Sequence, residues 1–159
     1  AAREAREGTG RPQGGTGTAR RALAAGEGDD SADGEAAGAD GIVATNTLSG
    51  MIIDIDARRP ILTNKVGGIA GPAMKPVAMK VVWQLYGAVK IPIIGTGGVT
   101  TGRDVIEYIM AGATAVGVGA AIYYGGIDVF KNITAEMETY MTENKITSLE
   151  EIRGVAHQI

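Results

Sequence analysis

Residues 91–98 read IPIIGTGG and residues 115–120 read AVGVGA, so that Gly119 follows Gly97 by 22 positions. One short amphipathic helix is expected between them. An apolar strand that ends in glycine leaves bare backbone N–H groups at its carboxyl edge, and two such edges side by side can cradle a phosphate. The last two βα loops of a (β/α)₈ barrel commonly do this. The pair therefore predicts parallel strands and a phosphate-bearing cofactor.

Composition limits the classes of function. The 159 residues suffice for one domain but fall short of the roughly 250 of a full (β/α)₈ barrel. A net charge of −3 gives no reason to expect nucleic acid or a membrane as a partner. No apolar run approaches the roughly 20 residues of a membrane span, and no signal peptide is visible. The chain has no cysteine and no cluster with metal-ligand spacing, so we expect a cytoplasmic protein without a metal.

The first 40 residues differ in kind from the rest. They hold one large aliphatic residue, Leu23, among mostly Ala, Gly, Arg, Asp and Glu. Such a stretch cannot bury enough apolar surface to offset its ordering entropy. We therefore expect residues 1–40 to form an irregular, low-complexity segment with no strand in 13–35. Residues 1–7 could form a helical turn or two, and residues 8–18 and 26–34 are expected to be loosely held.

Residues 41–159 carry the periodic patterns of alternating strands and helices. The expected strands are 41–45, 91–95 and 114–118, with a small hairpin from 51–55 and 60–63 and a glycine-rich loop at 65–72. The expected helices run from about 74 to 88, from a cap at Thr100 or Thr101 to near Gly112, and through 129–141, with a capping box at 148–151 opening a short last helix. Alternating βα units predict an α/β fold with a parallel sheet. We interpret residues 41–159 as the C-terminal part of a (β/α)₈ TIM barrel with a β-hairpin insert.

The order of the motifs is more specific than any one of them. Residues 45–47 read TNT, 67–76 read GGIAGPAMKP, 91–99 read IPIIGTGGV and 111–116 read AGATAV, followed by Gly119. From about residue 36 onward the chain resembles the C-terminal part of dihydroorotate dehydrogenase, in particular the NAD-linked type B catalytic subunit. The resemblance implies an FMN-containing barrel that oxidises dihydroorotate to orotate in pyrimidine biosynthesis.

The resemblance also assigns roles to residues. Asn46 and Thr47 would contact the pyrimidine, since an amide offers both a donor and an acceptor. The implied FMN contacts are Thr45, Gly71, Gly97, Gly98, Gly119 and Ala120, the last four through N–H groups to the phosphate. The intact enzyme would be a homodimer that passes electrons to a partner subunit carrying FAD and an iron–sulfur cluster, and then to NAD.

The sequence departs from the family in several places. Ala70 replaces the usual serine and Ala120 the usual threonine, and each change removes a hydroxyl. The family's catalytic base is a cysteine, which this chain lacks, so no catalytic residue is assigned. Residues 13–35 lack the lysine expected to contact the flavin. We hypothesise that they are translated out of frame. An apolar strand with a lysine in another frame of the coding DNA would support this, and its absence from all frames would refute it.

Two alternatives remain open at this stage. The chain could belong to another FMN- or phosphate-binding barrel, or it could be a truncated, inactive product. Among single residues, Lys75 is interpreted as a solvated residue at a helix start rather than a phosphate ligand. His157 is expected at a frayed C-terminus without a catalytic role. Trp83 and Tyr86 are expected to pack rather than to stack on a flavin.

Overall fold

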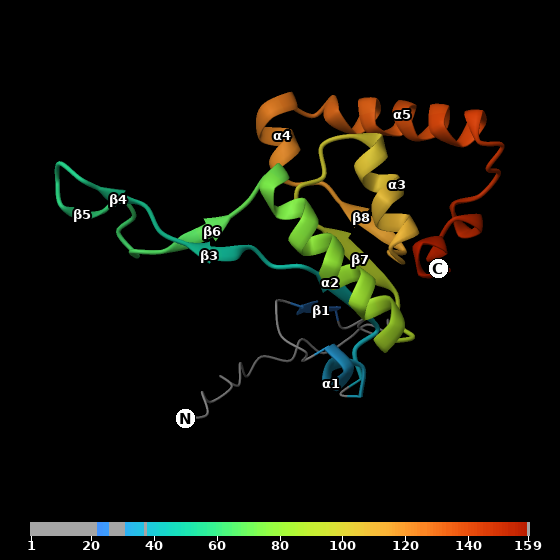
Figure 1. Ribbon diagram of the computed structural model, residues 1–159, viewed down its shortest axis with the longest axis horizontal. Coiled ribbons are helices and arrows are strands. Elements are labelled where there is room, and N and C mark those ends of the chain that lie inside the picture. Colours follow the sequence, from blue (N-terminus) through green and yellow to red (C-terminus); the bar gives the residue numbers. More distant parts are fainter. Residues whose placement is uncertain (1–21, 26–30, 37, 159) are drawn as a thin grey trace, which may run out of the picture.

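The computed structural model describes residues 22–25, 31–36 and 38–158, which form an α/β body and a projecting arm (Figure 1). Four strands form one sheet in the order β1-β2-β7-β8, and every neighbouring pair is parallel. Their bounds are β1 Ala22–Ala25, β2 Gly41–Ala44, β7 Ile93–Thr96 and β8 Ala115–Gly117. The three strands expected after residue 40 are confirmed.

One face of the sheet carries the core. Ile42 and Ala44 of β2 and Ile93 of β7 are buried, whereas Ile94 on the opposite face is 38% exposed. Helices α2 (Lys75–Ala88) and α3 (Gly102–Met110) supply the covering side chains, so the expected positions of both helices are confirmed. The other face of β7 is left open by the described residues. An open apolar face of this kind suits the inner surface of a barrel.

A third layer lies outside α3. Helix α5 (Val129–Glu143) crosses the first turn of α3, and Ile133 of α5 is buried in the same core (Figure 1). A short helix, α4 (Ala120–Gly125), was not expected and begins directly after Gly119. The capping box at Ser148 is confirmed, but it opens a 3₁₀ turn, η2 (Leu149–Glu151), and a second turn, η3 (Val155–His157), follows.

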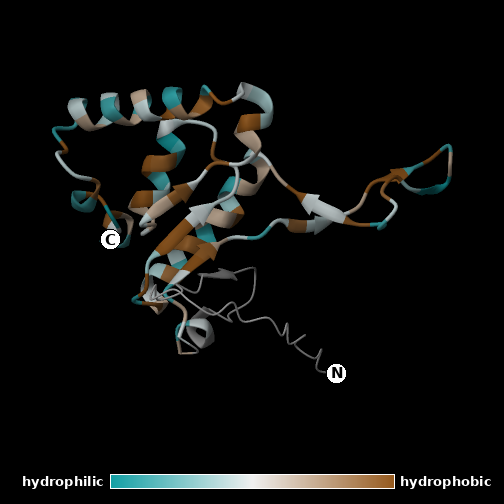
Figure 2. Cartoon of the chain, turned by 180° about the vertical axis from the view of Figure 1, so that it is seen from behind, coloured by the Kyte–Doolittle hydropathy of each residue, from teal (hydrophilic) through white to brown (hydrophobic). Residues whose placement is uncertain are grey.

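The expected hairpin is confirmed as an arm that projects from the body (Figures 1 and 2). Strand β3 (Leu48–Gly50) pairs antiparallel with β6 (Gly67–Ile69), and β4 (Ile53–Asp54) pairs with β5 (Arg59–Pro60). The expectation of a loop over 65–72 is wrong at residues 67–69, because pairing with β3 draws them into a strand. Figure 2 shows apolar residues on the arm; those exposed are Met51, Ile52, Ile53, Ile55, Ile61, Leu62, Val66 and Ile69.

The expectation of no strand in residues 13–35 is wrong at residues 22–25. Strand β1 pairs with β2 over Ala22↔Gly41 to Ala25↔Ala44, and helix α1 (Ser31–Ala36) follows. A neighbouring strand supplies hydrogen bonds that composition does not reveal, and such context overrides weak local preference. The expectations for residues 1–18, and for 26–30 of the segment thought to be loosely held, lie outside the described residues. No described helix is long and apolar enough to cross a membrane.

Candidate functional site

The carboxyl ends of β2 and β7, the segment after β8 and the base of the arm surround one hollow of about 150 Å³. Its lining residues are Thr45, Thr47, Ala70, Gly71, Met74, Thr96, Gly97, Gly98, Gly119 and Ala120. All six residues expected to contact the cofactor therefore lie together, and Thr47 joins them. Asn46 is not among the lining residues. Sequence reasoning assigned no role to Met74 or Thr96, although both stand within the quoted motifs at 67–76 and 91–99.

The two glycine segments meet because their strands are neighbours. The register of β7 with β8 sets Thr96 opposite Gly117, and the Thr96 hydroxyl donates to the Gly117 carbonyl oxygen at 3.2 Å. Neither the Gly98 nor the Gly119 amide donates a hydrogen bond to another described residue. Two backbone donors at adjacent strand ends are thus available to a ligand in the hollow.

The glycines that line the hollow differ in how much free space surrounds the position of a side chain. A Cβ on Gly71 or Gly119 would meet no atom within 4 Å, so both residues present bare backbone to free space. A Cβ on Gly98 would lie 2.6 Å from the Lys75 backbone nitrogen. Gly98 is therefore required by packing, while Gly71 and Gly119 leave room that a ligand could fill. This arrangement fits a phosphate-bearing group approached closely by backbone.

Residues 45–47 connect β2 to the arm at the rim of the hollow. Thr45 is 8% exposed, and its amide donates to the Thr96 carbonyl oxygen at 3.0 Å. Asn46 is exposed, and its Oδ1 accepts from the Thr47 amide at 2.8 Å. The bond to Thr47 occupies Oδ1, while Nδ2 makes no hydrogen bond within the described part of the chain. Asn46 therefore has a donor to offer a ring carbonyl, and Thr47 offers a hydroxyl.

Lys75 opens α2, as expected, and does not line the hollow, but its partly exposed side chain is paired rather than free in solvent. Its Nζ lies 2.7 Å from Oδ1 of Asp104 and 2.9 Å from Oε2 of Glu107. The hydrogen bond to Asp104, followed by that to Glu107, raises the pKa of Lys75 above its usual value. The lysine thus ties the start of α2 to α3.

Asp104 organises the loop between β7 and α3. Its Oδ2 accepts from the Thr100 amide at 2.8 Å, the Thr100 hydroxyl at 2.9 Å and the Thr101 amide at 2.9 Å. Its own amide donates to the Thr101 hydroxyl at 3.2 Å, which completes a capping box. Burial alone would raise the pKa of Asp104, but the bonds from Lys75, Thr100 and Thr101 outweigh it and lower the pKa to about 2.

We expect Asp104→Asn to lower the free energy of unfolding by about 2 kcal/mol at pH 7, the stabilisation that the lowered pKa represents. Because the folded pKa lies below the ordinary 3.8, the wild type keeps this contribution above about pH 4 and loses it as pH falls toward 2. Urea denaturation between pH 2 and pH 7 measures both effects. Asp128→Asn is the matched control, since Asp128 caps α5 without a side-chain hydrogen bond. If the two variants lost the same free energy of unfolding, the proposed stabilisation by the hydrogen bonds of Asp104 would be contradicted.

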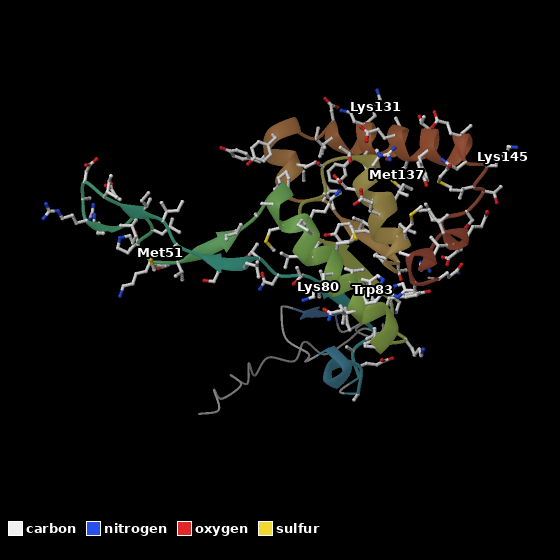
Figure 3. The ribbon with its side chains drawn as sticks, viewed as in Figure 1. Met51, Lys80, Trp83, Lys131, Met137 and Lys145 are labelled. Atoms are coloured by element: carbon white, nitrogen blue, oxygen red, sulfur yellow. The ribbon has the colours of Figure 1, made fainter. Side chains whose placement is uncertain are left out.

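The sole histidine of the chain anchors the C-terminal segment. The His157 ring stacks on Trp83 at 4.6 Å and 8°, tilts against Tyr86 at 4.9 Å, and places Nε2 3.0 Å from the Ala111 carbonyl oxygen. Figure 3 shows Trp83 on α2 beside the C-terminal turns. The expected packing roles of Trp83 and Tyr86 are confirmed, and the expected fraying at His157 is wrong because these rings hold it. Among the described residues, no cluster of acidic or histidine side chains could hold a metal.

Comparison with known proteins decides the family. The dihydroorotate dehydrogenase family model matches residues 25–141. The catalytic subunit of dihydroorotate dehydrogenase B (NAD(+)) from Methanocaldococcus jannaschii is 52% identical over 122 residues, which cover 77% of this chain and 40% of that protein. The chain belongs to the dihydroorotate dehydrogenase family. The corresponding subunit from Desulforamulus reducens is 50% identical over 123 residues, with the same coverage of 77% and 40%.

Solved dihydroorotate dehydrogenase structures share the fold. The enzyme from Eimeria tenella in complex with ferulenol superposes with a TM-score of 0.65 at 29% identity, over 82% of this chain and 35% of that one. The ligand-free form from the same organism gives a TM-score of 0.67. These matches confirm the predicted partial (β/α)₈ barrel. The chain spans about 40% of the length of the curated relatives that it matches.

Proposed function

We propose that this chain forms one wall of the site in an FMN-dependent enzyme that oxidises dihydroorotate to orotate in pyrimidine biosynthesis. One observation carries the proposal: the hollow gathers bare glycine backbone from two adjacent strand ends in a member of this family. When bound, FMN supplies the acceptor for the two electrons removed from the substrate. The residues of the chain bind and orient the two molecules.

The donors present suit the phosphate end of FMN. The amides of Gly97, Gly98, Gly119 and Ala120 would surround the phosphate, and Thr45 and Gly71 would lie against the flavin. A hollow of about 150 Å³ is smaller than the roughly 300–1,000 Å³ of complete ligand sites. It has room for part of a nucleotide, which fits a chain that spans about 40% of its relatives. The missing hydroxyls at Ala70 and Ala120 leave backbone as the main source of donors.

Asn46 and Thr47 would hold the pyrimidine at the rim. The bond between Oδ1 of Asn46 and the Thr47 amide leaves the Asn46 amide nitrogen to donate to a ring carbonyl. Thr47 lines the hollow, and its hydroxyl donates to Oδ1 of Asn46 at 3.5 Å. We assign no proton-transferring residue to this chain, which contains no cysteine.

We also propose that the intact enzyme is a homodimer and works with an electron-transfer subunit that carries FAD and an iron–sulfur cluster. The relatives named as NAD(+) catalytic subunits support a second kind of subunit. The arm supports contact with another chain, because eight large apolar side chains on it are between 44% and 81% exposed. Apolar surface of this extent is typical of interfaces.

The cofactor proposal is tested by titrating the purified full chain with FMN and following quenching of flavin fluorescence. We expect saturable binding, and a loss of affinity of about tenfold in Gly119→Ala, whose methyl group would occupy the space left for the ligand. Gly87→Ala is the control, because its added Cβ would also meet no atom within 4 Å but lies at an exposed position of α2, away from the hollow. A wild-type chain that does not bind FMN would refute the proposal.

A test of orotate binding distinguishes dihydroorotate oxidation from the function of another FMN-binding barrel. In the chain loaded with FMN, we expect orotate to perturb the visible absorbance of the flavin and uridine to leave it unchanged. An FMN-loaded chain that responds to neither compound would favour the other kind of barrel.

A further inference from the structure

Tyr108 of α3 lies directly behind the glycine loop. It is fully buried, and its hydroxyl donates to the Gly97 carbonyl oxygen at 2.7 Å. Among the described residues it is the largest of the fully buried side chains. No motif of the sequence singles it out, and neither FMN binding nor substrate binding as proposed above uses it.

Strand β7 has a glycine, Gly95, where the Tyr108 ring contacts it. A Cβ on Gly95 of β7 would lie 2.5 Å from Cδ1 of Tyr108, so only glycine lets the ring approach the strand this closely. Burial, with smaller contributions from the charges of Asp104 and Glu107, raises the pKa of Tyr108. Its hydroxyl therefore remains a hydrogen-bond donor at neutral pH.

The hydrogen bond determines where the next amide points. The Gly97–Gly98 peptide is not among the cis bonds of the described chain. In a trans peptide the carbonyl and the N–H lie on opposite sides of the bond. With the Gly97 oxygen turned toward Tyr108, the Gly98 N–H points away from α3. Gly98 lines the hollow and its N–H has no acceptor among the described residues.

Without this bond, neither polar group of the Gly97–Gly98 peptide would have a hydrogen-bond partner among the described residues. It is flanked by two glycines with positive φ, at +135° and +71°, and glycine backbone rotates more freely than that of other residues. Asp104 holds the loop only further along, at Thr100 and Thr101. Among the described residues, the Tyr108 hydroxyl is thus the hydrogen-bond donor that orients the Gly97 carbonyl and, with it, this peptide.

We propose that Tyr108 is a positioning residue for recognition of the FMN phosphate, because its hydroxyl turns the Gly98 amide toward the hollow. This inference rests on the proposed function and deepens it. It assigns Tyr108 a part in discriminating a phosphorylated flavin from an unphosphorylated one. An amide held in place before binding pays no ordering cost when the phosphate arrives.

The test compares FMN with riboflavin, which lacks the phosphate, in wild type, Tyr108→Phe and Tyr140→Phe. The Phe variant keeps the buried ring and removes only the hydroxyl. Tyr140 also packs against the core, and its hydroxyl donates to no described residue, so Tyr140→Phe is the matched control. We expect Tyr108→Phe to weaken FMN binding about fivefold and to leave riboflavin binding within about twofold of wild type.

The outcomes are distinct. If Tyr108→Phe lost the same affinity for FMN and for riboflavin, or lost none for either, the role of Tyr108 would be overturned. The proposal that the wild type binds FMN would still stand. A wild type that binds neither FMN nor inorganic phosphate would contradict the proposed function, and the inference would fall with it.

A measurement on the wild type keeps the inference testable if the variant unfolds. In ¹H–¹⁵N spectra, FMN should move the Gly98 amide proton strongly downfield, as expected when a phosphate oxygen accepts its bond. Bound FMN without such a shift at Gly98 would overturn the inference.

Discussion

Replacing Gly98 with alanine should abolish measurable FMN binding and lower the free energy of unfolding by about 3 kcal/mol. The residue has φ +71°, and a left-handed conformation costs an L-residue roughly 1–2 kcal/mol. The new Cβ would also lie 2.6 Å from the Lys75 nitrogen and 3.0 Å from the Gly71 oxygen. Both are backbone atoms, which cannot rotate aside, so overpacking adds about 1–3 kcal/mol.

Urea denaturation and FMN titration of the same preparations measure the two effects. Gly126→Ala is the control, because Gly126 also has positive φ, at +63°, but its Cβ would meet no atom within 4 Å. We expect that variant to lose about 1–2 kcal/mol and to keep its affinity for FMN. A Gly98→Ala chain as stable as Gly126→Ala would show that the contact with Lys75 relaxes, contrary to our expectation.

Gly102→Ala should destabilise the chain by about 3 kcal/mol, although alanine is the better helix former. Gly102 opens α3 where α5 crosses it, and its amide donates to Oε2 of Glu136 at 2.6 Å. A Cβ there would lie 2.5 Å from the Glu136 Cβ, 2.7 Å from the Ile133 oxygen and 2.8 Å from the Met137 nitrogen. Two of these are backbone atoms of α5, so the helices must separate.

Gly87→Ala, in contrast to Gly102→Ala, is expected to stabilise the chain. Gly87 is exposed on α2 with no atom within 4 Å of its Cβ, so alanine should raise the free energy of unfolding by about 0.5–1 kcal/mol through helix propensity alone. Thermal and urea denaturation of both variants give the comparison. If both substitutions stabilise, α3 and α5 do not pack as closely as described.

Local sequence patterns were sufficient to predict most strands and helices of the α/β body. Neighbouring residues predict a cap at Thr100 or Thr101, the period of α2 and the glycines after β7. The structure confirms the helix and the glycines and places the cap at Thr101. The hollow could also be anticipated, since the ends of consecutive parallel strands meet at one edge. Strand β1 could not be anticipated from the sequence, because its four residues, with one leucine among them, form a strand only by pairing with β2.

The sequence by itself determined the order of βα units, the family resemblance and the glycines that line the hollow. Only the tertiary structure decided that Lys75 pairs with Asp104, that His157 stacks on Trp83 and that Tyr108 holds the Gly97 carbonyl. The reason is physical. Strand and helix periods depend on residues a few positions apart. These contacts join residues 29, 74 and 11 positions apart, which meet only after the sheet and its helices pack.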